Sequence, residues 1–360
     1  MIKYKKKYTD KSFDIDKCRE SAESGYAPAQ YQLGECLETG THVSRNLSKA
    51  FNWYWQAYDH CRLANEKLDS GSFYSNLAGW LKNAVNDIVL KDDDLAEALQ
   101  LFGSCYEHGW GVNTDMTKAV EYWKKSAEMG NLQALDSLGY CYAHGLGGVI
   151  KSAEISFECY LEASERGFTE DYTTVGLCYL NGDGVQPNKS KAYYWFSKAA
   201  AHNDQPMAWT LLGKCCFEGI GCDIDYSEAA KWFNKAIEYG NSAFPDALRG
   251  LGDCYAMGLG IERDLYKAVN LYLQAAKVDD PESQYRLGRC YANGLGVEQD
   301  MKTAVSWYKK AASNVNENTG YKGHYEAMRC LADCYANGLG VRKNKELAAL
   351  WHRKAVEIET

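Results

Sequence analysis

Residues 282–312, ESQYRLGRCYANGLGVEQDMKTAVSWYKKAA, contain the pattern that decides the fold. Small and apolar residues return at three- and four-residue steps on both sides of a glycine-rich turn, which indicates two amphipathic helices. Gly294 stands where a helix end needs the left-handed backbone conformation, which glycine adopts at little cost. Asp300 has the short side-chain oxygen that caps the next helix. The stretch therefore predicts a helix, a turn and a second helix.

The same unit recurs along the chain. The first glycines of the turns are Gly40, Gly109, Gly145, Gly182, Gly219, Gly258, Gly294 and Gly338, and the residues in the cap position are Asn46, Asp115, Ser152, Asn188, Asp225, Asp264, Asp300 and Asn344. Apart from one step of 69 residues after Gly40, these glycines are 36 to 44 residues apart, a period typical of helical repeat arrays. A single unit cannot bury its aromatic rings, so neighbouring units must share a core. We therefore predict an all-α superhelical solenoid of about eight helix-turn-helix repeats.

The period divides the chain into four segments. We expect an N-terminal segment or cap at residues 1–24, a first repeat at 25–58, inserted or degenerate helices at 59–94, and seven repeats at 95–360. The last repeat should end in a capping helix, because polar His352 takes a position where other units carry a ring. We expect one continuous solenoid. Its unusual loops are the third turn, lengthened by Gly148, and residues 313–322.

The unit pattern Leu-Gly-x-x-Tyr-x-x-Gly-x-Gly-Val, then an acidic or amide cap and Lys-Ala-x-x-Trp-Tyr-x-x-Ala-Ala, resembles the Sel1-like repeat family, a relative of the tetratricopeptide repeats. The match spans about residues 25–58 and 95–358, although Leu37 and Cys216 stand where tyrosine is usual. The resemblance implies a right-handed α/α superhelix that acts as a scaffold, adaptor, regulator or secreted interaction protein. It implies no reaction, because a fold does not determine a function.

The composition limits which kinds of partner and which cellular location are expected. The chain has 360 residues and a formal net charge of -8, which disfavours a dedicated nucleic-acid binder because such proteins need a basic surface. The N-terminus is basic but has no apolar signal-peptide core, and no segment approaches the roughly 20 apolar residues that span a bilayer. We expect a monomeric, cytoplasmic protein without membrane insertion. Export by a specialised secretion system stays open as an alternative.

The cysteines follow the repeat. Eight of the 14 occupy one column just before the tyrosine position: Cys36, Cys105, Cys141, Cys178, Cys215, Cys254, Cys290 and Cys334. Equivalent positions in stacked helix pairs lie on the order of 10 Å apart, whereas a disulfide needs Cα atoms within about 7 Å. We therefore expect reduced thiols that pack as small apolar groups. Cysteine-rich relatives of the family join the helices of a unit through a second cysteine column, which this chain lacks.

Three patterns in the sequence are similar to those of chemical sites. The Gly-x-Gly turns follow helices rather than strands, so they are structural turns and not phosphate loops. Cys215, Cys216, Cys222, Cys330 and Cys334 lack the paired spacing of a zinc site. His108 and His144 precede the turn glycines of successive units, but no carboxylate or thiolate partner can be assigned to them. We expect no metal, no cofactor and no catalytic residue.

The expected binding surface is a concave groove. By analogy with tetratricopeptide domains, the first helices line it with residues that flank the Leu-Gly pair or precede the turn glycine. The candidate groove residues are Tyr140, His144, Lys214, Arg249, Tyr285, Arg289, Asn293 and Arg329. The arginines favour an acidic or carboxylate-ended partner, since arginine binds carboxylates bidentately. Alternatively, Asp253 and Asp333 neutralise these arginines in solvated pairs.

The leading functional hypothesis is a scaffold or adaptor that binds a protein or peptide, as a secreted bacterial effector or a signalling regulator does. The first alternative is a stoichiometric inhibitor, such as an immunity protein that blocks a toxin or enzyme. A metal-binding or enzymatic protein is the second alternative. A structural role through self-association of the ends or of residues 59–94 is the third.

Overall fold

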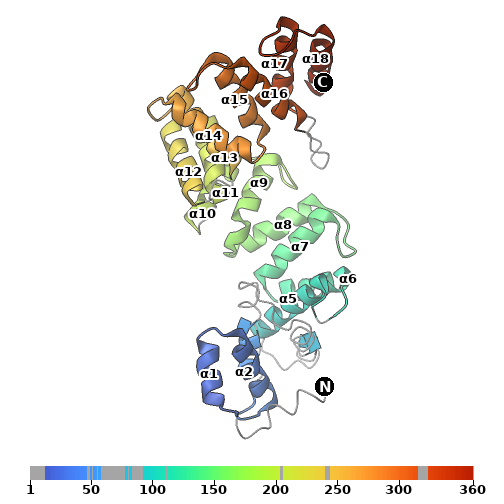
Figure 1. The fold of residues 1–360 in the computed structure, drawn as a ribbon. Coiled ribbons are helices and arrows are strands. Elements are labelled where there is room, and N and C mark those ends of the chain that lie inside the picture. The colour runs from blue at the N-terminus through green and yellow to red at the C-terminus, as the bar shows by residue number, and fades with distance from the viewer. Residues whose placement is uncertain are drawn as a thin grey trace. The chain divides into compact units, whose positions relative to one another are not determined.

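A computed structural model describes residues 13–46, 49–50, 52–54, 56–57, 78–79, 81–82, 92–110, 112–202, 206–239, 244–314 and 323–359 (Figure 1). Within these ranges all regular structure is helical and no strand occurs, which confirms the all-α prediction. The chain divides into two compact units: unit 1 contains residues 1–171 and 183–185, and unit 2 contains residues 172–182 and 186–360. No helix in the described part of the chain is both long and apolar enough to cross a membrane.

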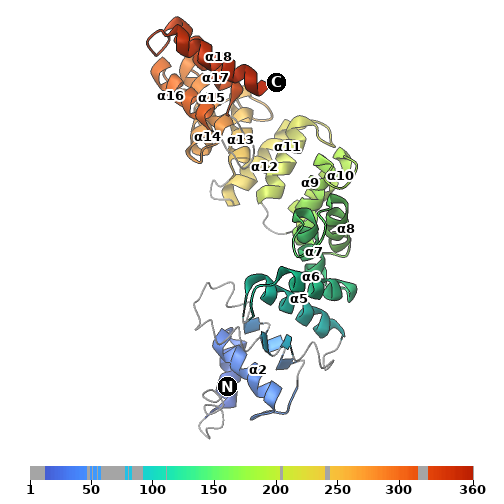
Figure 2. The same ribbon diagram turned by 90° about the vertical axis from the view of Figure 1, so that its right-hand side faces the viewer.

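The helices of both units alternate with short turns. Unit 1 contains α1 (Ile15–Glu23), α2 (Ala27–Thr39), α5 (Asp92–His108), α6 (Met116–Glu128), α7 (Leu132–His144), α8 (Ala153–Glu165) and the short 3-10 helix η1 (Thr169–Asp171). Unit 2 contains α9 (Tyr172–Asn181), α10 (Lys189–Ala201), α11 (Pro206–Glu218), α12 (Tyr226–Tyr239), α13 (Pro245–Met257), α14 (Leu265–Lys277), α15 (Pro281–Asn293), α16 (Met301–Ser313), α17 (Tyr325–Asn337) and α18 (Lys345–Glu359). Helix pairs such as α13 with α14 and α15 with α16 pack side by side (Figure 2).

The turn chemistry agrees with the sequence prediction. Gly294 ends α15 with a φ of 68°, and its N–H donates to the carbonyl of Cys290. All eight predicted cap residues accept a hydrogen bond from a backbone N–H of the helix that follows. These caps satisfy amide groups that would otherwise lack an acceptor, which is why the second helices begin where the sequence indicates.

The Leu-Gly pair of the motif makes room for a ring from the second helix. A Cβ atom at Gly288 would collide with the buried ring of Tyr308, and one at Gly139 would lie 2.8 Å from the ring of Tyr160. The last repeat has Ala332 in place of this glycine, and exposed His352 in place of the ring. A methyl group at this glycine position would collide with a buried ring. Ala332 is therefore compatible with the last repeat because His352 does not place a buried ring there.

The column cysteines contribute to the core as thiols. Cys105, Cys141 and Cys254 are fully buried, and no disulfide joins two cysteines within the described ranges. Burial raises the pKa of Cys105 and of Cys254 to about 12, so these thiols are not nucleophiles at neutral pH.

Two of the predicted segments reach beyond what the structure describes. Residues 1–12 lie outside the described residues, as does most of 59–94, apart from the helical residues 78–79 and 81–82 and the start of α5. The segment boundaries, and a single solenoid that continues through both units, stay predictions.

Candidate functional site

All eight predicted groove residues lie on first helices of repeats. Tyr140 and His144 are on α7, Lys214 is on α11, Arg249 is on α13, Tyr285, Arg289 and Asn293 are on α15, and Arg329 is on α17. Six of them are exposed, whereas Arg249 and Tyr285 are partly buried. In unit 2, Arg249 contacts carboxylates that sequence analysis did not connect to it, and Tyr285 stacks on His324.

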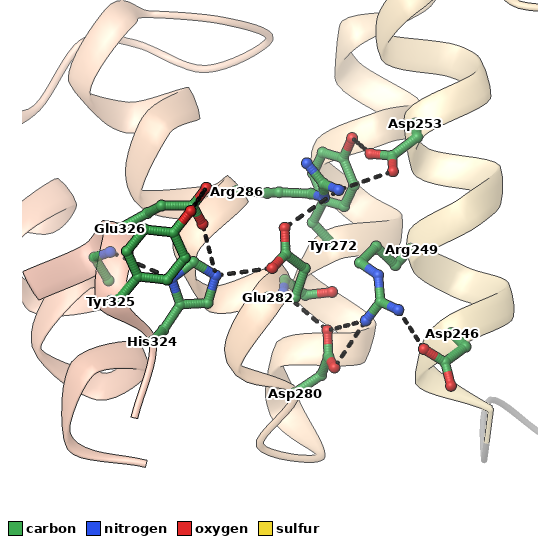
Figure 3. Close-up of polar contacts among 12 residues, drawn as sticks. Asp246, Arg249, Asp253, Tyr272, Asp280, Glu282, Arg286, His324, Tyr325 and Glu326 are labelled. Carbon is green, nitrogen blue, oxygen red and sulfur yellow. Dashed lines mark hydrogen bonds and ion pairs between the residues drawn. The ribbon is translucent and has the colours of Figure 1, made fainter. Parts of the chain in front are cut away.

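The Arg249 side chain is bound by carboxylates of the same chain. Its Nη1 lies 3.0 Å and 3.2 Å from the two carboxylate oxygens of Asp280, and its Nη2 contacts Asp246 (Figure 3). Burial opposes the charge of the guanidinium, but the carboxylates of Asp280 and Asp246 raise the pKa of Arg249. Asp280 also caps α15 by accepting from the Ser283 N–H at 2.8 Å. Arg249 thus holds the start of α15 against α13.

A second guanidinium, that of Arg286, pairs with Asp253, which sequence analysis offered as a neutralising partner for the candidate arginines. Asp253 is 9% exposed, and its Oδ2 lies 3.1 Å from Arg286 Nη2. The Tyr272 hydroxyl donates to its Oδ1 at 2.6 Å. Burial raises the pKa of Asp253, although Arg286 and Tyr272 favour its ionised form. Asp253 therefore forms a buried ion pair, and its partner is Arg286 rather than a candidate groove residue.

His324 joins this network from the next repeat. It precedes α17, is 6% exposed, and its Nδ1 accepts from the Ala327 N–H at 3.2 Å. Because Nδ1 is an acceptor, the neutral ring carries its proton on Nε2, which lies 2.8 Å from Glu282 Oε2 and donates to it. The ring also stacks on Tyr285, with centroids 4.5 Å apart. The hydrogen bond from His324 lowers the pKa of Glu282.

Neither Arg286 nor His324 was found from the sequence. Arg286 occupies a position between the columns assigned to the groove and to the core, and no repeat periodicity marks it. His324 had a usable signal, because it caps α17 and lies two positions after residues 313–322, where sequence analysis expected an unusual loop.

The arginine pair, defined as Arg289 and Arg329, differs from Arg249 and Arg286. Both side chains are exposed, and none of the ion pairs among the residues that the structure describes includes either of them. The Arg289 guanidinium lies 6.0 Å from the centroid of the Tyr285 ring, and its charge acts on Cys330, the neighbour of Arg329. Adjacent repeats therefore present two uncompensated cations. Asp333, the proposed neutralising residue, forms no ion pair with them in this part of the chain.

The two candidate histidines of unit 1 have structural partners. His144 Nδ1 is 2.9 Å from the carbonyl of Tyr140 and the two rings are 4.2 Å apart. His108 Nδ1 is 3.1 Å from the carbonyl of Ser104, and its ring stacks on Trp110. His108 Nδ1 also lies 3.3 Å from Glu107 Oε2, a carboxylate neighbour that sequence analysis did not assign to it. Among the described residues, no ion pair or hydrogen bond links the two histidines to a common partner.

Unit 1 contains a different polar feature, the acid pair of Asp136 on α7 and Asp171 in η1. Asp171 is 3% exposed, and it stands in a column that is otherwise small: Ala29, Ala98, Ala134, Ala208, Ala247, Ser283 and Ala327. Burial and the nearby Asp136 carboxylate raise the pKa of Asp171 to about 9. The Asp171 carboxyl is therefore protonated at neutral pH and shares a hydrogen bond with Asp136.

Comparisons with known proteins identify the repeat. The family model described as the Sel1 repeat matches residues 27–60, 94–131, 132–168, 175–204, 207–241, 245–280, 281–316 and 326–357. Among solved structures, the chain is similar to a protective antigen of uropathogenic Escherichia coli with an SLR fold, at 26% identity and a TM-score of 0.65, over 96% of this chain and 80% of that chain. It is also similar to a Sel1 repeat protein from Oxalobacter formigenes, at 33% identity and a TM-score of 0.60, over 71% of this chain and 96% of that chain.

Curated proteins match over a shorter stretch. Chitin synthase regulatory factor 3 of Schizosaccharomyces pombe is 29% identical over 156 residues, which are 40% of this chain and 16% of that protein. DAP3-binding cell death enhancer 1 of Mus musculus is 27% identical over 152 residues, which are 41% of this chain and 29% of that protein. The match thus spans less than a third of the length of either relative. Because the family model matches eight segments that make up most of the chain, this protein belongs to the Sel1 repeat family.

Proposed function

We propose that this protein is an interaction scaffold and that the arginine pair, with Tyr285 and Asn293 beside it, binds an acidic segment of a partner protein. Sel1 repeat proteins generally mediate protein–protein interaction, which supports the general role. The observation that carries the specific proposal is the exposure of Arg289 and Arg329 without ion-pair partners in the described part of a chain whose net charge is -8. Exposed arginines bind carboxylates bidentately, so an acidic peptide gains charge-assisted hydrogen bonds here.

A non-catalytic role fits the rest of the site. The carboxylates of Asp253, Asp280 and Glu282 are held by arginine, tyrosine or histidine side chains. General acid–base chemistry needs a group that can exchange its proton with a substrate, and these groups are engaged in the packing of α13, α15 and α17. The network therefore supports the shape of the proposed surface rather than a reaction.

The test uses a fluorescein-labelled peptide rich in glutamate and aspartate, with a lysine-rich peptide of the same length for comparison. We expect the acidic peptide alone to bind, and the double variant Arg289→Glu and Arg329→Glu to weaken its binding about tenfold or more, because repulsion replaces attraction. The charge-matched control carries Arg342→Glu and Arg353→Glu, which change exposed arginines outside the surface. Equal binding by the two double variants would contradict the proposal.

The biological role depends on what the partner does. A natural partner captured by cross-linking and lost by the same variant would carry the acidic segment. If binding abolishes the activity of that partner at equal stoichiometry, the role is that of an inhibitor. If the partner stays active or recruits a third protein, the role is that of an adaptor. Light scattering on the purified protein tests the expected monomer.

A further inference from the structure

Three side chains of unit 2 turn potential metal-ligand atoms toward one point. Glu282 in the first turn of α15, His324 before α17 and Glu326 in the first turn of α17 each offer one atom, and these atoms lie within 4.8 Å of one another (Figure 3). His324 Nε2 is 2.8 Å from Glu282 Oε2 and 3.6 Å from Glu326 Oε2. One imidazole nitrogen and two carboxylate oxygens form a donor set that suits borderline divalent metal ions.

The second oxygen of each carboxylate is held by an outer donor. Arg286 Nη2 lies 3.2 Å from Glu282 Oε1, and the Tyr325 hydroxyl donates to Glu326 Oε1 at 3.2 Å. Both Oε2 atoms therefore stay directed at the His324 ring. Hydrogen bonds of this kind orient the ligands of metal sites and set their basicity.

The charge around His324 is unbalanced. The network contains five carboxylates, on Asp246, Asp253, Asp280, Glu282 and Glu326, and two guanidinium groups, on Arg249 and Arg286. With all of these groups ionised and the His324 ring neutral, three negative charges remain uncompensated. A cation between Glu282 and Glu326 is therefore favoured electrostatically.

We propose that Glu282, His324 and Glu326 bind one divalent transition-metal ion, with Zn²⁺ as the best match to the donor set, and that the ion joins α15 to α17. Water completes the coordination, because three protein ligands leave at least one position open. The site lies between the seventh and eighth repeats, so the bound ion fixes the surface that carries the arginine pair.

Metal binding competes with the hydrogen bonds of the metal-free protein. His324 Nε2 must release its proton to become a ligand, and in the neutral ring that proton moves to Nδ1. The Ala327 N–H then loses its acceptor, which lies 3.2 Å away in the metal-free protein. The loss makes the site weaker than a closed structural zinc site.

The experiment titrates the purified, untagged protein with Zn²⁺ by calorimetry and with Co²⁺ by absorption spectroscopy. Cobalt is informative because thiolate ligands add an intense near-ultraviolet band that imidazole and carboxylate ligands do not, which distinguishes this site from the 14 cysteines. We expect one ion per chain, a cobalt spectrum without that band, and a higher melting temperature in the presence of Zn²⁺.

Two variants test the ligands without removing the helix cap. His324→Asn keeps a side-chain acceptor for the cap, as Asn131 does at the start of α7, and Glu326→Gln keeps an oxygen for Tyr325. Each should weaken metal binding about tenfold or more and abolish the rise in melting temperature. Glu298→Gln, at an exposed glutamate outside the triad, should bind as the wild type does. The proposal is overturned if the wild type binds neither ion at millimolar concentration, or if both variants bind with unchanged affinity.

Discussion

Two contacts between neighbouring repeats bury carboxyl groups in opposite protonation states. Between α15 and α17, Glu282 is ionised, accepts a hydrogen bond from the neutral His324 ring and pairs with Arg286. Between α7 and η1, Asp171 is kept neutral by protonation beside Asp136. The difference shows that the same kind of repeat contact accepts either an ion pair or a shared proton, because each lowers the cost of burying a carboxyl group.

The two contacts also differ in what the repeat pattern requires. Asp171 replaces an alanine or serine of the other repeats, so it adds a polar group where the fold needs a small one. His324 occupies a cap position, where the fold needs a hydrogen-bond acceptor in any case. His324 therefore meets a need of the fold, a helix cap, and also binds the Glu282 carboxylate. Asp171 meets no such need, so the acid pair adds the energetic cost of burying a carboxyl group without a structural gain.

The largest effect is expected from breaking the ion-pair contact at Arg286. Arg286→Met keeps the apolar stem of the side chain but leaves the Asp253 and Glu282 carboxylates without their guanidinium. We expect a loss of about 3 kcal/mol in the free energy of unfolding, because one member of a buried pair is removed. Urea unfolding followed by circular dichroism measures it. Arg329→Met is the exposed control, and an equal loss in both variants would contradict the role assigned to Arg286.

The acid pair should make the protein less stable as the pH rises, whereas an ion-paired carboxylate makes a protein more stable as the pH rises. The Asp171 pKa of about 9 in the folded protein exceeds the value of about 3.9 in unfolded chains, so ionisation favours unfolding between these values. Stability should thus fall as the pH rises from about 4 to about 9. The Asp171→Asn variant should not show this fall, and its free energy of unfolding at pH 8 should exceed that of the wild type by about 1–3 kcal/mol.

Melting temperatures measured across this pH range test the acid pair. Asp223→Asn, at an exposed aspartate, should keep the pH dependence of the wild type. A flat wild-type profile would show that Asp171 is ionised in the folded protein.

A smaller effect separates the two roles of His324. His324→Ala removes the cap of α17, the hydrogen bond to Glu282 and the stacking on Tyr285, so we expect a loss of about 2 kcal/mol. His324→Asn restores the cap and should recover about 1 kcal/mol of this loss. Thermal unfolding in the presence of a chelator compares the two variants. If they melt at the same temperature, the cap contributes nothing and the ring contacts dominate.

The smallest effect on stability is expected at the arginine pair. Arg289→Gln and Arg329→Gln remove exposed charges that make no ion pair among the described residues, so each should change the free energy of unfolding by less than about 0.5 kcal/mol. The same substitutions should weaken binding of the acidic peptide. A large loss of stability would place these side chains in the packing and would remove the basis of the proposed surface.

The repeat units could be predicted because their signals are local. Gly294 and Asp300 act on backbone groups within a few residues, and each agrees with the structure. The match of Gly288 with Tyr308 was not part of the sequence prediction, although both residues follow the repeat and both are replaced in the last unit, by Ala332 and His352.

The candidate site could be predicted only in part. Sequence analysis placed Arg249, Arg289 and Arg329 on equivalent faces of first helices, and it could not distinguish the engaged arginine from the exposed ones. Arg249 is bound by Asp280, 31 residues away in the next repeat. The repeat period does not specify such pairs, because the carboxylate occupies a different position in the unit from the arginine that it binds.

By itself, the sequence determined that this chain forms Sel1 repeats and where each turn and cap lies. These features depend on backbone conformation and side-chain size within one unit, which periodicity reveals. Only the tertiary structure decided which charges are neutralised, because Coulomb and hydrogen-bond energies depend on distances between side chains of different repeats. For that reason Arg286, His324 and Asp171 became visible as buried polar residues only after the helices were stacked.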